Sequence, residues 1–419
     1  MGNFKIKSIW ESKGAIKTQE KTKIFIPYEK IKENGNDSFW DIFNAPVYRI
    51  PSMVITDNGR IVVVCDYRSN ARDQVAIVPV VAISDDNGKT FRKKLLYEAN
   101  QIPEPSWKNA NFRTMDPTMF YYKGKIHIIF GRWNGTKNNG NWTQTQNDDT
   151  WGVLHAISND NGETWELNWN FQNSVSGFPQ GASWLGGVGN AIITKFGTCV
   201  VPVQFSPQAG KVSASFIYSN DGNTWTKFSG NADGISENSL FQWINFSKNA
   251  EITMIGRRDP NTGNNKYGGV VIQTGPTTFQ NNTWQTFATF NGKIPARGSS
   301  GCQGSAISNS NENGNFSDAP YVLVSYAANY MSNIGAYIRD HITLAAFTRG
   351  NATQNNSMKL TDLSIINENP GSFVDGIPYG GYSIMAVNWN CNKIGIVYED
   401  MLGISYKDLS YLIPQMKGE

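Results

Sequence analysis

The stretches "ISDDNGKTF" (83–91) and "ISNDNGETW" (157–165) match each other almost position for position, and they decide the fold. A third, shorter copy, "YSNDGNTW" (218–225), carries Asn220 in place of an acidic residue. The serines of the three copies fall at positions 84, 158 and 219, so successive copies are 74 and 61 residues apart. An interval of this size is typical of one four-stranded propeller blade with long loops.

Each copy has the composition of a tight turn. An Asp or Asn side chain can accept hydrogen bonds from backbone amides two residues further on, and Gly88 and Gly162 permit a positive φ. The terminal Phe91 or Trp165 can cover the apolar face of a blade. We therefore predict that the acidic residues of the repeat stabilise turns and take no part in catalysis.

Between these turns the chain alternates as strands do, for example in 59–68, 124–133, 319–327 and 392–400. At about 60–70 residues a blade, strands delivered in fours predict an all-β fold with six blades, a six-bladed β-propeller. The stretch "GISYKDLSYL" (403–412) could pair with N-terminal strands to close the ring. Since no linker or low-complexity tract divides the chain, we predict one propeller over 46–419, with 1–45 as a lead-in segment that packs on it or closes it.

Composition excludes several classes of function. The net charge of +3 over 419 residues does not favour nucleic acid binding, and no apolar run is long enough to span a membrane. The four cysteines are far apart and show no CxxC spacing, which argues against a disulfide framework or a zinc site. We expect no metal site and no cofactor. Without an apolar signal sequence, the chain is expected to be cytoplasmic, or exported with its signal peptide absent from this chain. We expect a monomer.

One residue breaks the strand pattern. In "NAPVYRIPSMVIT" (44–56), Arg49 lies within an apolar, β-prone run. A buried charge without a partner is strongly disfavoured, so Arg49 should meet an anion, either internal or supplied by a ligand.

With "YRIP" and the repeated turn, the chain resembles the sialidases (neuraminidases), and most of all the small bacterial ones. In the sialidases the repeated turn is called the Asp box. The resemblance extends from about Val47 to Leu409 and implies a six-bladed propeller. The other matching stretches are "RTMDPT" (113–118), "WLGGVGN" (184–190), "SEN" (236–238), "GSSGCQGS" (298–305), "AYIRD" (336–340), "GGYS" (380–383) and "IGIVYE" (394–399).

The resemblance implies a triad of arginines that binds the carboxylate of a sialoside, and these fall on Arg49, Arg257 and Arg339. Arg258 follows Arg257 directly, so the middle assignment can shift by one position. Glu399 matches the glutamate that holds the first arginine. We therefore expect Arg49 to have Glu399 on one side and the substrate on the other.

The same resemblance implies that Tyr382 is the nucleophile and Glu237 its acidic partner. The acid/base aspartate falls on Asp73, five residues past Arg68. Arg68 and Asp116 match the residues that meet the far hydroxyls of the sugar. A tyrosine nucleophile suits a substrate that carries its own carboxylate, because a carboxylate nucleophile would be repelled by it.

Three further residues, Trp142, Trp151 and Leu185, could line an apolar pocket for the N-acetyl methyl group, although packing inside the blades explains them equally well. Cys302 lies in a glycine-rich loop without a histidine nearby in sequence, which argues against a thiol nucleophile. The function implied is that of a retaining exo-α-sialidase acting on sialylated oligosaccharides, glycoproteins or glycolipids. A trans-sialidase, including one that forms an anhydro-sugar, and a non-catalytic sialic-acid-binding propeller remain the alternatives.

Overall fold

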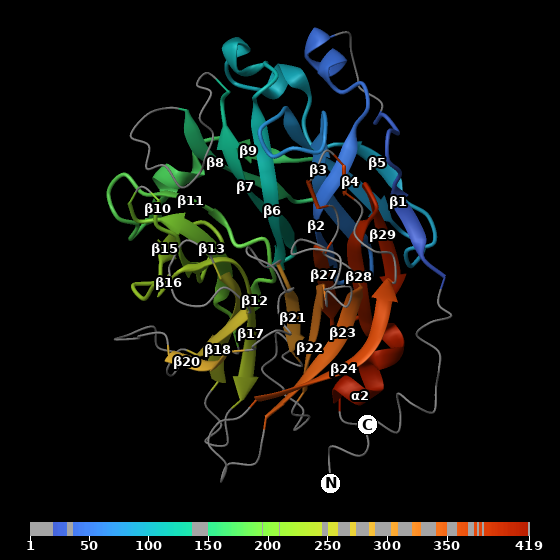
Figure 1. Ribbon diagram of the computed structural model, residues 1–419, viewed down its shortest axis with the longest axis vertical. Helices are drawn as coiled ribbons and strands as arrows, with labels where there is room; N and C mark the ends of the chain where they lie inside the picture. The colour runs from blue at the N-terminus through green and yellow to red at the C-terminus, as the bar shows by residue number, and fades with distance from the viewer. Residues whose placement is uncertain are drawn as a thin grey trace.

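The computed structural model describes residues 20–31, 37–135, 150–194, 196–208, 210–244, 250–258, 269–273, 285–289, 303–308, 321–327, 341–349, 358–367, 373–374, 377–378 and 381–417. These residues form mainly antiparallel β-sheets arranged around a central axis (Figure 1).

Six groups of four strands form the blades. Blade 1 contains β2 (Val47–Ile55), β3 (Ile61–Arg68), β4 (Ile77–Ser84) and β5 (Arg92–Leu95). Blade 2 contains β6 (Arg113–Tyr122), β7 (Lys125–Trp133), β8 (Trp151–Ser158) and β9 (Glu166–Asn168). Blade 3 contains β11 (Ser183–Gly186), β13 (Cys199–Ser206), β14 (Ser213–Ser219) and β15 (Trp225–Lys227). Blade 4 contains β17 (Ile235–Ile244), β18 (Ala250–Arg258), β19 (Gly269–Gln273) and β20 (Gln285–Thr289). Blade 5 contains β21 (Ser305–Ser308), β22 (Tyr321–Ala327), β23 (Ile342–Arg349) and β24 (Met358–Asn367). Blade 6 contains β27 (Ser383–Asn388), β28 (Lys393–Asp400), β29 (Gly403–Asp408) and β1 (Thr22–Phe25).

The remaining elements are short. They are the strands β10 (Val175–Ser176), β12 (Ile192–Ile193), β16 (Ala232–Asp233), β25 (Phe373–Val374) and β26 (Ile377–Pro378), the 3-10 helices η2 (Ser38–Ile42), η3 (Ala99–Gln101), η4 (Pro105–Trp107), η5 (Phe171–Ser174) and η8 (Ser410–Leu412), and the helix α2 (Ile413–Lys417). None of the helices within the described ranges has the length and apolar character needed to cross a membrane.

The blades meet along their inner strands. β2 contacts β6 and β27, β6 contacts β11, and β17 contacts both β13 and β21, while β21 contacts β27. Blades 1 and 2 are also joined where β4 and β6 run parallel, at Ile77 and Arg113. The predicted six-bladed β-propeller is confirmed.

The sixth blade takes its outermost strand from the other end of the sequence. Thr22 lies opposite Tyr406, and Phe25 opposite Ile404, so β1 completes the sheet of β27, β28 and β29. The predicted pairing between 403–412 and an N-terminal strand is therefore seen. The division of the chain at residue 45 stays a prediction.

Hydrophobic side chains fill the space between neighbouring blades. Every residue of β2, β3 and β4 is buried. Because both faces of a blade are covered by its neighbours, these strands read as continuous apolar runs such as "IVVVC" (61–65) rather than as strict alternation. The few charged residues inside these runs therefore need internal partners.

The repeated turns are stabilised as the sequence predicts. In the second, Asp160 accepts hydrogen bonds from the Ser158 hydroxyl at 2.8 Å, the Thr164 amide at 2.8 Å and the Thr164 hydroxyl at 2.5 Å. In the first, Asp86 accepts from Thr90 in the same way, and these hydrogen bonds lower the pKa of Asp86 to about 2. Hydrogen bonds donated to a carboxylate favour its charged form, so these bonds stabilise the turns at neutral pH, where the carboxylates are ionised.

The third turn corrects one prediction. We predicted that Asn220 stands at the acidic position, and this is wrong: Asp221 accepts from the Ser219 hydroxyl at 2.9 Å and from the Thr224 amide at 2.7 Å. This turn is one residue shorter, but it keeps its acid two residues after the serine.

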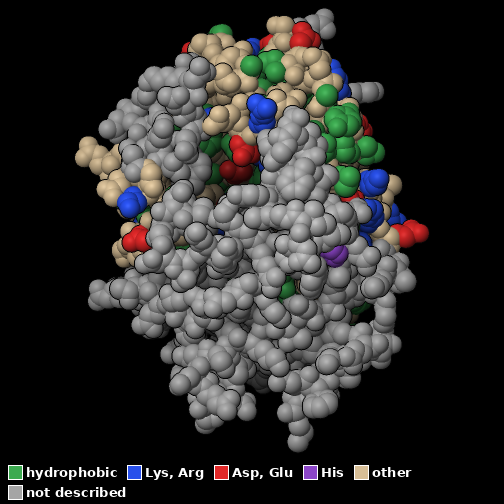
Figure 2. All heavy atoms as spheres, viewed as in Figure 1, with side chains coloured by type: hydrophobic (Ala, Val, Ile, Leu, Met, Phe, Trp, Pro, Cys, Tyr) green, Lys and Arg blue, Asp and Glu red, His purple; other side chains and the backbone are tan. Residues whose placement is uncertain are grey.

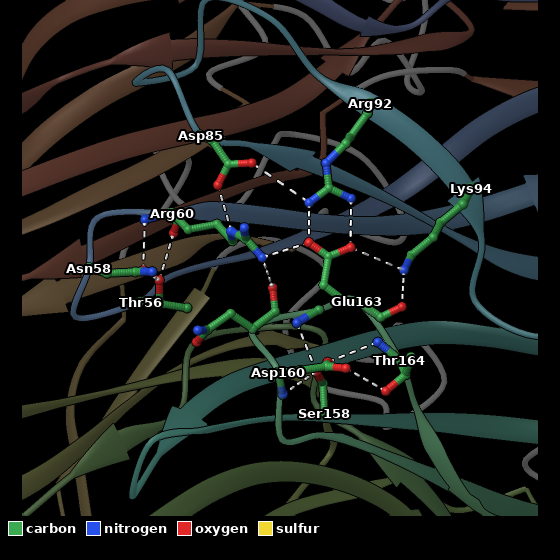
Figure 3. Close-up of polar contacts among 12 residues, drawn as sticks. Thr56, Asn58, Arg60, Asp85, Arg92, Lys94, Ser158, Asp160, Glu163 and Thr164 are labelled. Atoms are coloured by element: carbon green, nitrogen blue, oxygen red, sulfur yellow. Dashed lines mark hydrogen bonds and ion pairs between the residues drawn. The ribbon is translucent and has the colours of Figure 1, made fainter.

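Each of these turns lies against the preceding blade. The second turn reaches the first blade through Glu163, which pairs with Arg60 at 2.8 Å and with Arg92 (Figure 3). The third reaches the second blade, where the Tyr122 hydroxyl donates to the carbonyl of Asn220 at 2.9 Å. The turns therefore hold neighbouring blades together as well as closing their own hairpins.

The first turn meets the sixth blade in the same way. The ring of Phe91 packs edge-to-face on Tyr406, with 5.8 Å between centroids. Gly88 has a φ of +80°, and a Cβ there would lie 2.1 Å from the Tyr406 ring. Only glycine fits this close approach, which lies beside the strand pair that closes the ring.

Replacing Asp160 with alanine is expected to lower the free energy of unfolding by about 1–3 kcal/mol, because three hydrogen bonds are lost from a partly exposed turn. Thermal melting followed by circular dichroism measures the loss, and activity per folded molecule should be unchanged. Asn159→Ala is the matched control, since the Asn159 side chain donates to the exposed Glu166 side chain at 2.8 Å and its loss should leave the melting temperature close to that of the wild type. Lost activity without lost stability would overturn the structural role of Asp160.

Two histidines, His127 and His155, form a buried pair between the second and third blades, with His127 Nδ1 and His155 Nε2 3.1 Å apart. Phe120 stacks on His127, with 4.9 Å between centroids. Burial lowers the pKa of His127 to about 4 and that of His155 well below its usual value. Both rings are therefore neutral core residues at pH 7.

This pair predicts acid sensitivity. Below about pH 6.5 the unfolded chain takes up protons on both rings while the folded chain does not, so stability should fall as the pH drops from about 6.5 toward 4. Thermal melting at pH 7.5, 6 and 5 measures the effect. The double substitution His127→Gln/His155→Gln should flatten this dependence, and an unchanged slope in that variant would contradict the prediction.

Candidate active site

Interrupted strand pairing marks the innermost strands where the candidate residues lie. The register of β2 shifts between Arg49 and Ser52, and Ile50 there has a φ of 52°. The register of β6 shifts between Met115 and Thr118, and Asp116 has a φ of 60°. Both residues precede a proline, which disfavours a helical conformation, and a positive φ is costly for a β-branched residue. Such local strain is typical of functional sites and requires tertiary contacts to hold it.

Glu399 supplies such contacts at Ile50. One of its carboxylate oxygens accepts from the Ile50 amide at 3.0 Å and from Arg49 Nε at 3.3 Å. The other oxygen faces the Tyr382 amide at 3.4 Å, and the Glu399 amide donates to the Tyr382 carbonyl at 3.0 Å. Buried Glu399 thus fixes both the first candidate arginine and the backbone of the candidate nucleophile.

Tyr382, Glu237 and Arg257 meet at their polar atoms. The Tyr382 hydroxyl donates to Glu237 Oε1 at 2.5 Å. Arg257 Nη1 lies 2.8 Å from Glu237 Oε2 and 3.1 Å from Tyr382 Oη. Arg49 lies over the tyrosine ring, with its Cζ 5.6 Å from the ring centroid. The phenol therefore has a proton acceptor and two cations around it.

Asp73 pairs with Arg49 through a different nitrogen from the one that meets Glu399. It is the exposed member of the group, with 69% of its side chain accessible. Its Oδ1 lies 2.5 Å from Arg68 Nη1 and 3.5 Å from Arg49 Nη1, and its carbonyl accepts from Arg113 Nη1 at 3.0 Å. Burial lowers the pKa of Arg113 to about 10, which still leaves it charged at pH 7.

Arg68 and Asp116 lie next to this carboxylate. The Asp116 amide donates to Asp66 Oδ1 at 3.1 Å, and Arg68 is fully buried against Asp66. Burial, followed by the nearby Asp66, raises the pKa of Asp116 well above its usual range. Figure 2 shows acidic side chains in a hollow on one face of the molecule, with a basic side chain close by.

The structure thus brings eight of the predicted residues into one group of direct or neighbouring contacts. They are Arg49, Arg68, Asp73, Asp116, Glu237, Arg257, Tyr382 and Glu399. Of the two adjacent arginines, Arg257 is the one for which a contact in this group is described. Arg339, Trp142 and Cys302 lie outside the described residues.

The two remaining predictions, Trp151 and Leu185, lie in the interior. Trp151 is 7% exposed within a core cluster that also contains Trp133, and Leu185 is 0% exposed. Their burial favours the packing alternative over an open pocket wall.

Sequence reasoning missed Asp66 and Arg113. Asp66 lies in an apolar strand, "IVVVCDYR" (61–68), just as Arg49 does in its own strand. The argument that a buried charge needs a partner applies to it equally and would have found it. In the described parts of the chain, no group of three or more His, Cys, Asp or Glu residues is placed to hold a metal ion.

Comparison with known proteins agrees with this geometry. A family model described as a BNR repeat-like domain matches residues 50–262. The chain is 30% identical over 394 residues to a sialidase of Paraclostridium sordellii, covering 90% of this chain and 86% of the relative. It is 31% identical over 400 residues to a sialidase of Clostridium perfringens, covering 92% and 93%.

A sialidase of Trypanosoma rangeli, solved in complex with sialic acid, superposes with a TM-score of 0.68 at 21% identity. The match covers 96% of this chain but 60% of that one, so this chain spans about 60% of the length of that structure. This likeness bears on the fold, whereas the two bacterial relatives match nearly end to end. The chain therefore belongs to the sialidase family and is a glycoside hydrolase.

Proposed function

We propose that the protein is a retaining exo-α-sialidase that releases terminal sialic acid from oligosaccharides, glycoproteins or glycolipids through Tyr382. The observation that carries the proposal is the 2.5 Å contact between the Tyr382 hydroxyl and Glu237, with Arg257 at 3.1 Å from the same hydroxyl. A propeller that only binds sugar has no need of a phenol that is paired with a carboxylate in this way.

The arginines suit the carboxylate of the substrate. Arg49 and Arg257 approach Tyr382 from different blades, and a guanidinium matches a carboxylate with two parallel hydrogen bonds. Each charged hydrogen bond is worth about 1.5–3 kcal/mol, so this recognition can dominate binding. Arg339 would complete the triad, as the family resemblance implies.

Tyr382 needs help to ionise. A phenol has a reference pKa of about 10, so its ionisation at pH 7 costs roughly 4 kcal/mol. Glu237 accepts the proton while the bond forms between Tyr382 Oη and the anomeric carbon, and Arg257 stabilises the phenolate. The bond from the anomeric carbon to the aglycone oxygen breaks at the same time, and protonated Asp73 donates its proton to that oxygen.

Water completes the reaction. Asp73, now a carboxylate, takes a proton from a water molecule that attacks the anomeric carbon. The bond to Tyr382 breaks, and the phenolate recovers its proton from Glu237. Two displacements at one carbon return the original configuration, and this defines a retaining enzyme.

Turnover of 4-methylumbelliferyl α-sialoside tests the proposal, with the first product followed by NMR. We expect free sialic acid to appear first as the α-anomer. An anhydro-sugar, or transfer to added lactose, would instead establish a trans-sialidase. A folded protein that binds sialic acid without turnover would establish a non-catalytic binding propeller and overturn the proposal.

A further inference from the structure

We propose that Asp66 is a positioning residue for the acid/base step, and that it acts on Asp73 through Arg68. The inference rests on the proposed function and adds a residue that neither the sequence motifs nor the resemblance assigns. Asp66 lies on β3, next to the innermost strand β2 and opposite Arg49 in the strand register.

Two nitrogens of Arg68 donate to one oxygen of Asp66, and the contact is closed to solvent. Asp66 Oδ2 accepts from Arg68 Nη2 at 2.7 Å and from Nε at 3.2 Å, and both side chains are 0% exposed. These two bonds fix the plane of the guanidinium. They leave Nη1 as the nitrogen that extends toward the catalytic side, where it meets Asp73 Oδ1 at 2.5 Å and the Arg72 carbonyl at 3.4 Å.

Asp73 depends on such contacts because packing cannot hold it. Its side chain is 69% exposed and lies in the segment between β3 and β4, outside any strand. The fixed guanidinium of Arg68 makes the shortest of its described ion pairs, since Arg49 is 3.5 Å away. A donor must lie within about 3 Å of the oxygen that it protonates, so small displacements of Asp73 slow that step.

The second oxygen of Asp66 serves the next blade. Asp66 Oδ1 accepts from the Asp116 amide at 3.1 Å, where the backbone has a φ of 60° before Pro117. One buried carboxylate therefore fixes groups of both blades that border the site. The two functions use different oxygens of the one carboxylate.

Asp66→Asn tests the contact with Arg68. The asparagine has one acceptor oxygen in place of two and carries no charge, so it cannot accept from both the Asp116 amide and the Arg68 guanidinium, and it loses the charged contact that holds Arg68. We expect kcat/KM for sialyllactose, whose leaving group needs protonation, to fall by about 10- to 100-fold. The fall for 4-methylumbelliferyl sialoside, which has a better leaving group, should be less than about threefold.

A double-mutant cycle tests whether Asp66 acts through Arg68. Asp66→Asn added to Arg68→Gln should lower kcat/KM for sialyllactose no further than Arg68→Gln alone does. A further tenfold loss in that background, or equal losses for both substrates in the single variant, would overturn the proposal. Asp160→Ala is the control for lost stability alone, and it should show no dependence on the leaving group.

The design also separates this inference from the proposed function. Wild-type protein without turnover of either sialoside would overturn the proposed function and this inference with it, whereas active wild type with an equally active Asp66→Asn variant would overturn the inference alone. Asp66→Ser replaces Asp66→Asn if the latter does not fold, because its smaller side chain leaves room for water beside Arg68. Failure of both to fold, measured by circular dichroism, would assign Asp66 a structural role and overturn the proposal.

Discussion

Tyr382→Phe is expected to lower kcat by about a thousandfold or more while the protein folds normally and still binds a sialic-acid-like anion. The substitution removes one hydroxyl from a ring that is 4% exposed, and it keeps the packing of that ring. The hydroxyl is the atom that contacts both Glu237 and Arg257, so its loss removes the nucleophile and leaves the arginines. Steady-state kinetics and calorimetric titration with an unsaturated sialic acid analogue measure the two effects separately.

Tyr122→Phe is the matched control. Its hydroxyl is also hydrogen-bonded, to the carbonyls of Gly197 and Asn220, but it serves the contact between the second and third blades. This variant should lose stability and keep its turnover. In wild type, a fluorinated sialoside that slows the second displacement should add one sugar to Tyr382, and a label found on Glu237 would refute the proposed mechanism.

Asp73→Ala should divide substrates by their leaving groups. Hydrolysis of sialyllactose should slow by about 10²–10⁴-fold, because a sugar alkoxide leaves poorly without a proton. The first displacement with 4-methylumbelliferyl sialoside needs little acid assistance and should be affected far less. Comparison of kcat/KM for the two substrates isolates the first displacement, in which the aglycone leaves. The attack of water, for which Asp73 acts as the base, comes after that displacement and does not enter kcat/KM.

Asp57→Ala provides the control for removal of a carboxylate elsewhere in the same blade. Asp57 lies in the turn between β2 and β3, where it accepts from Asn388 at 3.0 Å. It should leave the ratio between the two substrates unchanged. An Asp73→Ala variant that slows both substrates equally would remove Asp73 from the role of acid.

The fold was predictable because its strongest signal is local. The hydrogen bonds that Asp160 accepts from Ser158 and Thr164 lie within seven consecutive residues, so a short stretch of sequence is enough to predict how this turn closes. The copy at 218–225 has one residue fewer, so matching it to the other copies from the glycine and the terminal aromatic residue puts Asn220 at the acidic position. Its serine-to-acid spacing, as in Ser219 and Asp221, was the more reliable guide.

The candidate site was predictable only in part. Arg49 stood out as a charge in an apolar strand, but its partner Glu399 is 350 residues away and was found through the family resemblance. The backbone of Ile50 could not be predicted, because local rules for a residue before proline favour an extended conformation. Contacts with Glu399 override that preference, and tertiary contacts of this kind cannot be predicted from a short stretch of sequence.

The strand pair that completes the sixth blade has a consequence for the order of folding. Thr22 pairs with Tyr406, so β1 is among the first described strands to be synthesised and its partner β29 is the last. Closing so long a stretch of chain costs entropy that only the finished contact repays, and non-local pairs of this kind form slowly. Until then β1 and β29 both carry unpaired backbone groups that can pair with another chain. Assembly of the ring therefore ends only after β29 has left the ribosome, and the interval before that step is when the chain is most exposed to aggregation.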